Sequence, residues 1–284
     1  MSTSTESGHI QIGCQGWNYA DWVTPAAGAA EVFYPRGTRA PEMLEVYARA
    51  FETVEIDSTF YAVPSASAID GWLKHTPPGF TFSLKLPQTI THENALRGAA
   101  AEEIMKEFCA RARGLEAKLA SVLIQLPPQF TATPENFRSL AEFLPLLPAD
   151  IRFGVEFRDR DWFNEKTVEL LVRYHVVPAL VEGMWVESER VWRMAENWPG
   201  DFVYVRWMGE RDLTRFDIVQ RARDENLRAW GAVLRNLSKR VPRVCAYFSN
   251  FYEGHAPASA NKLKGLLGQA TINPDDLENQ PSLF

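Results

Sequence analysis

The sequence predicts an α/β fold, a (β/α)8 TIM-barrel-like domain in which eight parallel strands form a closed barrel. Eight short apolar runs alternate with segments of helical character along the chain. Strand followed by helix, repeated, implies parallel strands joined by right-handed crossovers. Eight such units in about 250 residues fit a closed barrel better than an open sheet. Polar or charged residues also occupy one parity of these runs, as expected of a barrel with a polar interior.

The elements follow one another regularly. The predicted strands span residues 10–17, 53–58, 81–86, 121–126, 151–158, 176–182, 202–207 and 243–250. The predicted helices span residues 39–52, 65–76, 99–117, 134–146, 165–174, 221–239 and 257–268, with a short candidate at 187–196 before the seventh strand. Each strand except the last is thus followed by a helical segment before the next strand begins, and the last helix closes the series.

The second strand shows the alternation most clearly. Val54 and Ile56 alternate with Glu55 and Asp57, so the two pairs point to opposite faces of the strand. The other runs add further polar or small residues: Gln11, Gly13, Gln15, Thr81, Ser83, Lys85, Gln125, Arg152, Gly154, Glu156, Arg158, Glu182, Tyr204, Arg206, Cys245, Tyr247 and Ser249. Because active sites of such barrels lie where the strands end, charges gathered there predict a ligand site.

Composition indicates one large domain at residues 10–271, with flexible tails at 1–9 and 272–284. No apolar run is long enough to cross a membrane, and we expect no signal peptide. The three cysteines, Cys14, Cys109 and Cys245, lie in apolar contexts and predict buried thiols in a cytoplasmic protein. A net charge of −6 argues against nonspecific nucleic-acid binding over the whole surface.

Familiar cofactor motifs are missing from the sequence. It contains no GxGxxG, GxxxxGK[ST], HExxH, CxxC or GxSxG pattern, so we predict no cofactor. His92 and His255 follow the third and eighth strands and belong to the functional end of the barrel. Together with carboxylates they could bind a single metal ion, and this alternative stays open.

The charged rim has two interpretations. Charges removed from water must pair, so the cluster could be a structural ionic core. Alternatively, Lys85, Arg158 and Arg206 hold an anion, Glu156 or Asp57 acts as general base, and a histidine acts as general acid. The predicted catalytic residues are Asp57, Lys85, His92, Glu156, Arg158 and Arg206.

Further residues near the strand ends are candidates for substrate binding. Aromatic rings there could stack on a base or a sugar, or could simply pack beneath the loops. Gly254 permits an unusual backbone conformation, and Pro257 fits the first turn of a predicted helix whose free amides could hold a phosphate. The predicted substrate-binding residues are Gln15, Trp17, Glu55, Tyr61, Gln125, Glu182, Trp207, Tyr247, Asn250 and His255.

Several segments resemble the YecE-like family, the domain of unknown function numbered seventy-two. The matching stretches are residues 13–17 (GCQGW), 54–61 (VEIDSTFY), 82–87 (FSLKLP) with 91–92, 124–130 (IQLPPQF), 155–158 (VEFR) with 162, 204–207 (YVRW), 247–250 (YFSN) and 254–257 (GHAP). One departure is Asp57, where the family pattern more often looks like Asn. The resemblance implies a TIM-barrel-like fold and leaves the reaction open.

Residues 280–284, Gln-Pro-Ser-Leu-Phe, resemble the short peptide by which bacterial DNA polymerases and repair proteins dock on the sliding clamp. Leu283 and Phe284 would be the apolar anchors, and Gln280 and Ser282 would add polar contacts. Pro281 replaces the usual Leu or Met. The alternative is a tail that packs both anchors on the barrel.

Three functional hypotheses follow. The first is an enzyme acting on a phosphate-bearing substrate, with damaged DNA or a nucleotide as one option and a hydrolase or lyase as the reaction class. The second is a non-catalytic, ligand-binding adaptor tethered to the sliding clamp. The third is a metal-assisted hydrolase that uses His92 and His255, and a sugar-phosphate enzyme unrelated to DNA competes with the first.

Overall fold

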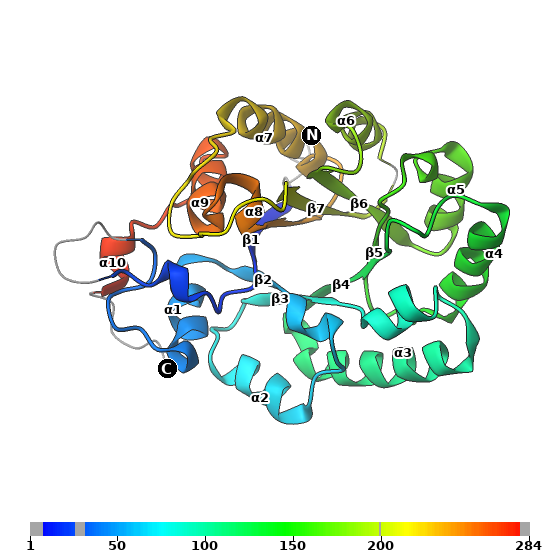
Figure 1. Ribbon diagram of the computed structural model, residues 1–284, viewed down its shortest axis with the longest axis horizontal. Helices are drawn as coiled ribbons and strands as arrows, with labels where there is room; N and C mark the ends of the chain where they lie inside the picture. Colours follow the sequence, from blue (N-terminus) through cyan, green and yellow to red (C-terminus); the bar gives the residue numbers. More distant parts are fainter. Residues whose placement is uncertain (1–7, 26–31, 199, 279–284) are drawn as a thin grey trace, which may run out of the picture.

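The computed structural model describes residues 8–25, 32–198 and 200–278, and these form the predicted closed parallel barrel (Figure 1). The strands pair in sequence order, and β8 closes against β1. Their bounds are β1 His9–Gln15, β2 Thr53–Ile56, β3 Thr81–Lys85, β4 Leu119–Gln125, β5 Phe153–Glu156, β6 Val176–Gly183, β7 Phe202–Gly209 and β8 Arg243–Phe248.

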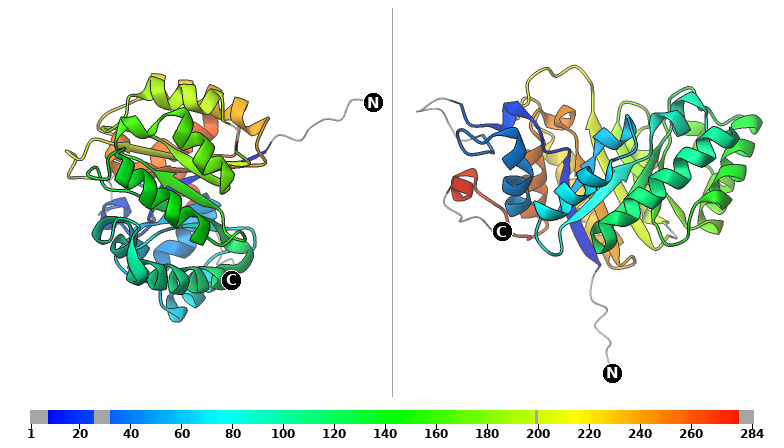
Figure 2. Two further views of the ribbon diagram at one scale, coloured as in Figure 1. Left: turned by 90° about the vertical axis from the view of Figure 1, so that its right-hand side faces the viewer. Right: turned by 90° about the horizontal axis from the view of Figure 1, so that it is seen from below.

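Helices surround the barrel, and the loop after β7 projects from the end at which the strands finish (Figure 2). The bounds of the helices are α1 Met43–Ala50, α2 Ala66–Lys74, α3 Gly98–Ala112, α4 Pro134–Phe143, α5 Glu165–Arg173, α6 Ser188–Glu196, α7 Asp224–Ser238, α8 Asn250–Glu253, α9 Ala256–Leu266 and α10 Pro274–Glu278. The short helix predicted before the seventh strand is therefore confirmed as α6. In the described part of the chain no helix is long and apolar enough to cross a membrane.

The side chains that face into the barrel form a polar middle layer. The Tyr247 hydroxyl lies 3.0 Å from Thr53 Oγ1 and 2.7 Å from Ser83 Oγ, and Ser83 Oγ lies 2.8 Å from Ser121 Oγ. Thr81 Oγ1 donates to Thr53 Oγ1 and accepts from the Gln11 amide. Hydroxyl groups buried in this way make their hydrogen bonds inside the protein, and they form an uncharged layer below the carboxyl ends of the strands.

The outer faces of the strands are apolar and pack against the helices. Val54, Ile56, Phe82 and Leu84 are all fully buried in this layer, as the alternation predicted. The three cysteines are free and buried, which confirms the prediction of buried thiols.

Two predictions at the ends of the chain need correction. His9 was placed in the flexible tail, but it opens β1 and pairs with Arg243. The tail predicted from Ile272 onward is also wrong for its described part, because α10 follows and buries Leu277. The Asn261 side chain holds this segment by donating to the Ile272 carbonyl at 2.8 Å and accepting from its N–H at 3.1 Å. The residues predicted to bind the clamp, Gln280 to Phe284, lie outside the described residues.

The segment after β8 also differs from the predicted loop, because it contains the short helix α8. The Ser249 hydroxyl caps its start by accepting from the Phe251 N–H at 3.3 Å. Gly254 ends it with φ of +110°, a conformation that favours glycine. The chain can then turn directly into α9.

Candidate active site

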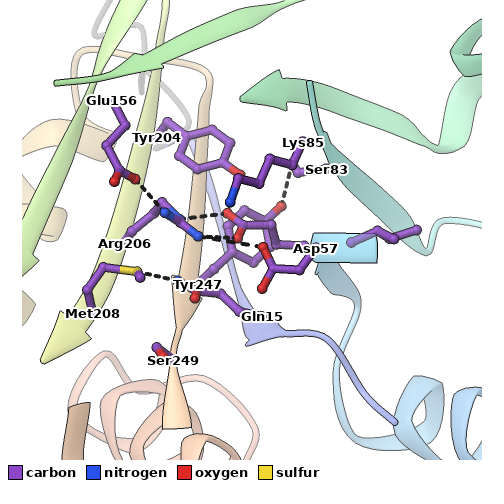
Figure 3. Close-up of polar contacts among 12 residues, drawn as sticks. Gln15, Asp57, Ser83, Lys85, Glu156, Tyr204, Arg206, Met208, Tyr247 and Ser249 are labelled. Atoms are coloured by element: carbon purple, nitrogen blue, oxygen red, sulfur yellow. Dashed lines mark hydrogen bonds and ion pairs between the residues drawn. The ribbon is translucent and has the colours of Figure 1, made fainter. Parts of the chain in front are cut away.

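A buried arginine organises the charges at the carboxyl ends of the strands (Figure 3). Arg206, on β7, donates to both carboxylate oxygens of Glu55 on β2, through Nε at 2.9 Å and Nη2 at 2.6 Å. Its Nη1 donates to Glu156 at the end of β5. The Tyr204 hydroxyl, one inward position earlier on β7, donates to Glu55 at 2.6 Å. These four residues form an ion-pair network that we call the charged floor.

The charged floor is removed from water. The exposed fraction of the side chain is 1% for Arg206, 0% for Glu55 and 1% for Glu156. Burial raises the pKa of the Glu55 carboxyl, with Arg206 opposing the rise. Burial also acts to raise the pKa of Glu156, but Arg206 and Arg158 together outweigh it and lower that pKa. The guanidinium of Arg206 therefore has its directional bonds committed to protein carboxylates, as in a structural ionic core.

A second group of charges lies at the mouth, above the floor. We use "mouth cluster" for Asp57, Lys85, His92 and Arg158. The Lys85 Nζ lies 3.9 Å from the centroid of the Phe60 ring, and it makes no hydrogen bond or ion pair with the described residues. Asp57 has 40% of its side chain exposed, and its Oδ1 lies 3.8 Å from Arg206 Nη2. The mouth cluster thus keeps polar atoms that the protein itself does not use.

Local backbone contacts place the mouth cluster. The 3-10 turn η3, Asp57–Phe60, follows β2 directly. Thr59 Oγ1 donates to the Lys85 carbonyl at 2.8 Å and accepts from the Lys85 N–H at 2.9 Å, which ties η3 to the end of β3. Both Asp57 and the Phe60 ring are therefore held beside Lys85.

His92 belongs to a π-helical turn, η4 Thr89–Glu93, and its ring packs edge-on against Phe60 with centroids 4.9 Å apart. Thr91 Oγ1 donates to the Pro87 carbonyl at 3.4 Å and lies 2.9 Å from His92 Nδ1. The Thr91 oxygen is thus free to accept from Nδ1–H, which leaves the lone pair on Nε2.

Burial sets the protonation states in the mouth cluster. It lowers the pKa of Lys85 to about 8, with Arg206 adding to the effect and Asp57 opposing it. Burial, followed by the nearby charges of Lys85 and Arg158, lowers the pKa of His92 to about 4. His92 is therefore a neutral imidazole at neutral pH, and a fraction of Lys85 is a free amine.

Arg158 is a cation of the mouth cluster with unused hydrogen-bonding capacity. Its Nε donates to Glu156 Oε1 at 3.1 Å, while Nη1 and Nη2 have no hydrogen-bond partner among the described residues. Its guanidinium carbon lies 5.7 Å from the centroid of the Trp185 ring. The side-chain amide of Gln125, between β3 and β5, likewise makes no hydrogen bond with the described residues. Gln15 donates to Met208 Sδ at 3.0 Å at the same end of the barrel.

Glu182 does not join these charges, which corrects its predicted place in the rim. On β6 the residues in register with Tyr204 and Arg206 are Ala179 and Val181, so Glu182 points outward. Its carboxylate accepts from Asn226 at 2.8 Å, from Tyr252 at 3.3 Å and from the Trp230 indole. It is a satisfied carboxylate between the barrel wall and α7.

Trp207 is in register with Glu182 and points outward too. Its ring is fully buried and stacks on Phe248 with centroids 4.1 Å apart. The Trp207 ring thus packs in the protein interior, away from the mouth, which differs from the position expected for stacking on a ligand.

Asn250 and His255 form a separate cluster outside the mouth. Asn250 Oδ1 accepts from the Trp22 indole at 3.1 Å and from the Ala256 N–H at 3.0 Å, so a side chain already occupies the predicted anion-binding amide of α9. His255 packs edge-on against Trp22 with centroids 6.2 Å apart. Among the described residues, no three His, Cys, Asp or Glu side chains gather closely enough to hold a metal ion. The open alternative of a metal site made by His92, His255 and carboxylates therefore has no such group of ligands in the described part of the chain.

The remaining predicted binding residues fall into different environments. Tyr247 belongs to the buried hydroxyl layer, below the charged floor. Trp17 packs edge-on against Trp72 and is half-buried, whereas Tyr61 is 73% exposed. Of these three, Tyr61 has the most exposed side chain.

Two contributors to the site were missing from the predicted set. Tyr204 has the same inward parity as Arg206, and this parity could have identified it as a site residue. Its hydroxyl group is uncharged, however, and the candidates were selected mainly by charge. Phe60 is one of the strand-end aromatic residues for which both stacking on a ligand and packing are open, and its contact with Lys85 depends on the turn that follows β2.

Comparison with known proteins agrees with this architecture. The family model described as "Protein of unknown function DUF72" matches residues 11–282. The UPF0759 protein YunF of Bacillus subtilis is 26% identical over 277 residues, which covers 91% of this chain and 94% of that protein. The UPF0759 protein YecE of Escherichia coli K12 is 32% identical over 154 residues, 54% of this chain, and the match spans half the length of that relative.

Solved structures give the same result. A DUF72 family protein from Thermotoga maritima superposes with a TM-score of 0.73 at 25% identity, covering 92% of this chain and 99% of that chain. One from Enterococcus faecalis superposes with a TM-score of 0.71 at 18% identity, covering 93% and 97%. The chain therefore belongs to the DUF72 (UPF0759, YecE-like) family.

Proposed function

We propose that this protein is an enzyme that acts on a phosphate-bearing substrate by acid–base chemistry at the carboxyl-terminal rim of the barrel. The observation that carries the proposal is the division between the charged floor and the mouth cluster. The floor uses its charges internally, whereas the mouth cluster keeps unused N–H groups beside a carboxylate and a neutral imidazole. Unused, directional groups at this end of such a barrel are what substrate binding and proton transfer need.

The anion-binding role falls to Arg158 and Lys85 in this proposal, and Arg206 becomes a positioning residue. Arg206 would have to give up Glu55 or Glu156 to bind a phosphate. Release of Glu55 would leave a buried carboxylate without a cation, and release of Glu156 would leave that carboxylate with Arg158 alone. Arg158 can offer two Nη groups in a planar fork without breaking any contact.

The proton-transfer roles also change from those expected of the sequence. With a pKa of about 4, His92 is a proton acceptor at neutral pH rather than the general acid. Lys85, with a pKa of about 8, is the better proton donor. Glu156 is held as a carboxylate by two arginines, so Asp57 is the carboxylate that remains open to a substrate.

Charge balance limits how the site attracts its ligand. Three cations, Lys85, Arg158 and Arg206, face three carboxylates, Glu55, Asp57 and Glu156. Phosphate binding at this site rests on short-range hydrogen bonds more than on net charge. We therefore expect moderate affinity with a weak dependence on salt.

The test is a mass-spectrometric screen of phosphate monoesters, nucleotides and short oligonucleotides that contain an abasic site. We expect wild-type protein to convert at least one compound, with Lys85→Met and Arg158→Gln each slowing conversion at least tenfold. Lys74→Gln, which changes an exposed lysine of α2, is the matched control and should leave the rate unchanged. Conversion that survives both mouth variants would show that the reaction occurs elsewhere.

Residues 280–284 support a second proposal, that the protein docks on the bacterial sliding clamp and works in DNA metabolism. The supporting observation is the pair of apolar anchors, Leu283 and Phe284, beside Gln280 and Ser282. Fluorescence polarisation should detect clamp binding by the full chain, and removing the two anchors should abolish it. Equal binding by both chains, or none, would count against this proposal.

A further inference from the structure

We propose that Lys85 is a nucleophile that forms an imine with a substrate carrying both a carbonyl and a phosphate group. The inference deepens the proposed function, because it assumes that the phosphate of that substrate sits on Arg158. It adds a covalent role for Lys85 and narrows the substrate class to phosphorylated aldehydes or ketones.

The surroundings of the amine are the first argument. Lys85 is only 8% exposed, yet its Nζ has no carboxylate within ion-pair distance among the described residues and faces the Phe60 ring at 3.9 Å. Other half-buried or buried lysines are engaged: Lys118 donates three hydrogen bonds at 2.8–3.2 Å, and Lys264 lies 3.5 Å from the Ala50 carbonyl. A buried amine without an ion-pair partner loses its proton more readily and becomes a nucleophile.

The protonation state agrees with the geometry. Burial and the Arg206 charge lower the pKa of Lys85 to about 8, from an ordinary value of 10.5. At pH 7 roughly a tenth of the amine is then unprotonated, against less than about a thousandth for an exposed lysine.

The neighbours of Lys85 supply the other needs of imine formation. The Nζ lone pair attacks the carbonyl carbon, a C–N bond forms, and the C=O π electrons move to oxygen, which takes a proton from solvent water. His92 Nε2 accepts a proton from nitrogen and returns it to the hydroxyl group. The C–O bond breaks, water leaves, and the nitrogen lone pair forms C=N. His92 and Lys85 contact the same Phe60 ring, and Asp57 can offset the charge of a protonated imine.

Reductive trapping tests the inference. The protein is incubated with glyceraldehyde 3-phosphate and sodium cyanoborohydride, whose hydride reduces an imine to a stable secondary amine. Intact mass gives the stoichiometry, and peptide mapping gives the site. We expect one dominant adduct, on Lys85, at least tenfold above that on the exposed Lys74. Lys85→Met, checked for folding by thermal unfolding, should lose the dominant adduct.

The outcomes separate this inference from the proposed function. An adduct on Lys85 no stronger than on Lys74, or no adduct, overturns the inference. If glycerol 3-phosphate binds in an Arg158-dependent manner and Lys85 stays unlabelled, the inference fails while the proposed function stands. If glyceraldehyde labels Lys85 as well as its phosphate does, and glycerol 3-phosphate gives no protection, the imine stands and the phosphate-binding role fails.

The pH dependence of amine labelling adds a readout that needs no substrate. Competitive acetylation should label Lys85 with a midpoint near pH 8, about two units below the ordinary value for an exposed lysine side chain. A midpoint for Lys85 at that ordinary value would overturn the inference independently of any carbonyl compound.

Discussion

Replacing Arg206 with methionine should destabilise the protein strongly, because it removes the cation from a fully buried network. Arg206 pairs with Glu55, which is 0% exposed, and with Glu156, which is 1% exposed. Removing one partner of a buried ion pair typically costs about 3–5 kcal/mol, since the other charge is left uncompensated. Arg158 still pairs with Glu156, so most of the loss should come from Glu55, which keeps only the Tyr204 hydroxyl.

The assay is urea unfolding at pH 7, followed by tryptophan fluorescence. Arg206→Met should lose about 3–5 kcal/mol of unfolding free energy. Adding Glu55→Gln should recover at least half of that loss, because the uncompensated carboxylate is gone. In the single variant, the pKa of Glu55 should rise further. Its folded state then binds more protons than the unfolded state, so lowering the pH should narrow the gap to wild type.

Two results would refute this reasoning. A loss below about 1 kcal/mol would place Arg206 among ordinary surface pairs rather than in a structural floor. A double variant no more stable than Arg206→Met would show that Glu55 is not the source of the cost.

Three further predictions concern residues outside the mouth. Burial lowers the pKa of His255 to about 4 from 6.5, so the unfolded state binds more protons than the folded state between these pH values. The free energy of unfolding should therefore fall as the pH drops through this window, by at most ~1.4 kcal/mol per pH unit. His255→Asn should reduce that pH dependence in urea unfolding. Gly254→Ala should cost more than about 1–3 kcal/mol, because φ is +110° and a Cβ would lie 2.6 Å from a backbone oxygen, whereas Gly71→Ala in α2 meets no atom within 4 Å and should gain about 0.5–1 kcal/mol in the same assay. Glu182→Gln should lose about 1–3 kcal/mol, since an amide N–H₂ then faces a donor, while calorimetry should find phosphate-ester binding unchanged.

The fold was predictable because it depends on periodicity that is written along the chain. Alternation in each strand separates inward from outward residues, and eight strand–helix units admit few topologies. The pairing of Glu55 with Arg206 was predictable in outline for the same reason, since both have inward parity and both stand near strand ends.

The predictions for Glu182 and His255 failed because the direction of each side chain depends on neighbouring strands and turns rather than on local sequence. Glu182 follows a run of apolar residues, and only its register with Trp207 shows that it points away from the interior. His255 and His92 both follow strands, but the turn around α8 directs His255 toward Trp22. Loop geometry of this kind has no periodic signal.

The division of labour within the charges was likewise beyond sequence reasoning. The sequence does not show that Arg206 donates its hydrogen bonds to two carboxylates while Arg158 leaves Nη1 and Nη2 without a partner. Such a difference depends on distances of a few ångströms between residues far apart in the chain.

The most direct test of the central claim is calorimetric titration of glycerol 3-phosphate into wild type and two mouth variants. Arg158→Gln removes the fork that we propose holds the phosphate, so affinity should fall at least tenfold. Asp57→Asn removes a negative charge from the same mouth, so affinity should rise. Opposite shifts of this kind are expected only if the phosphate sits at the mouth cluster. No binding by wild type, or no change of affinity in either variant, would contradict the account.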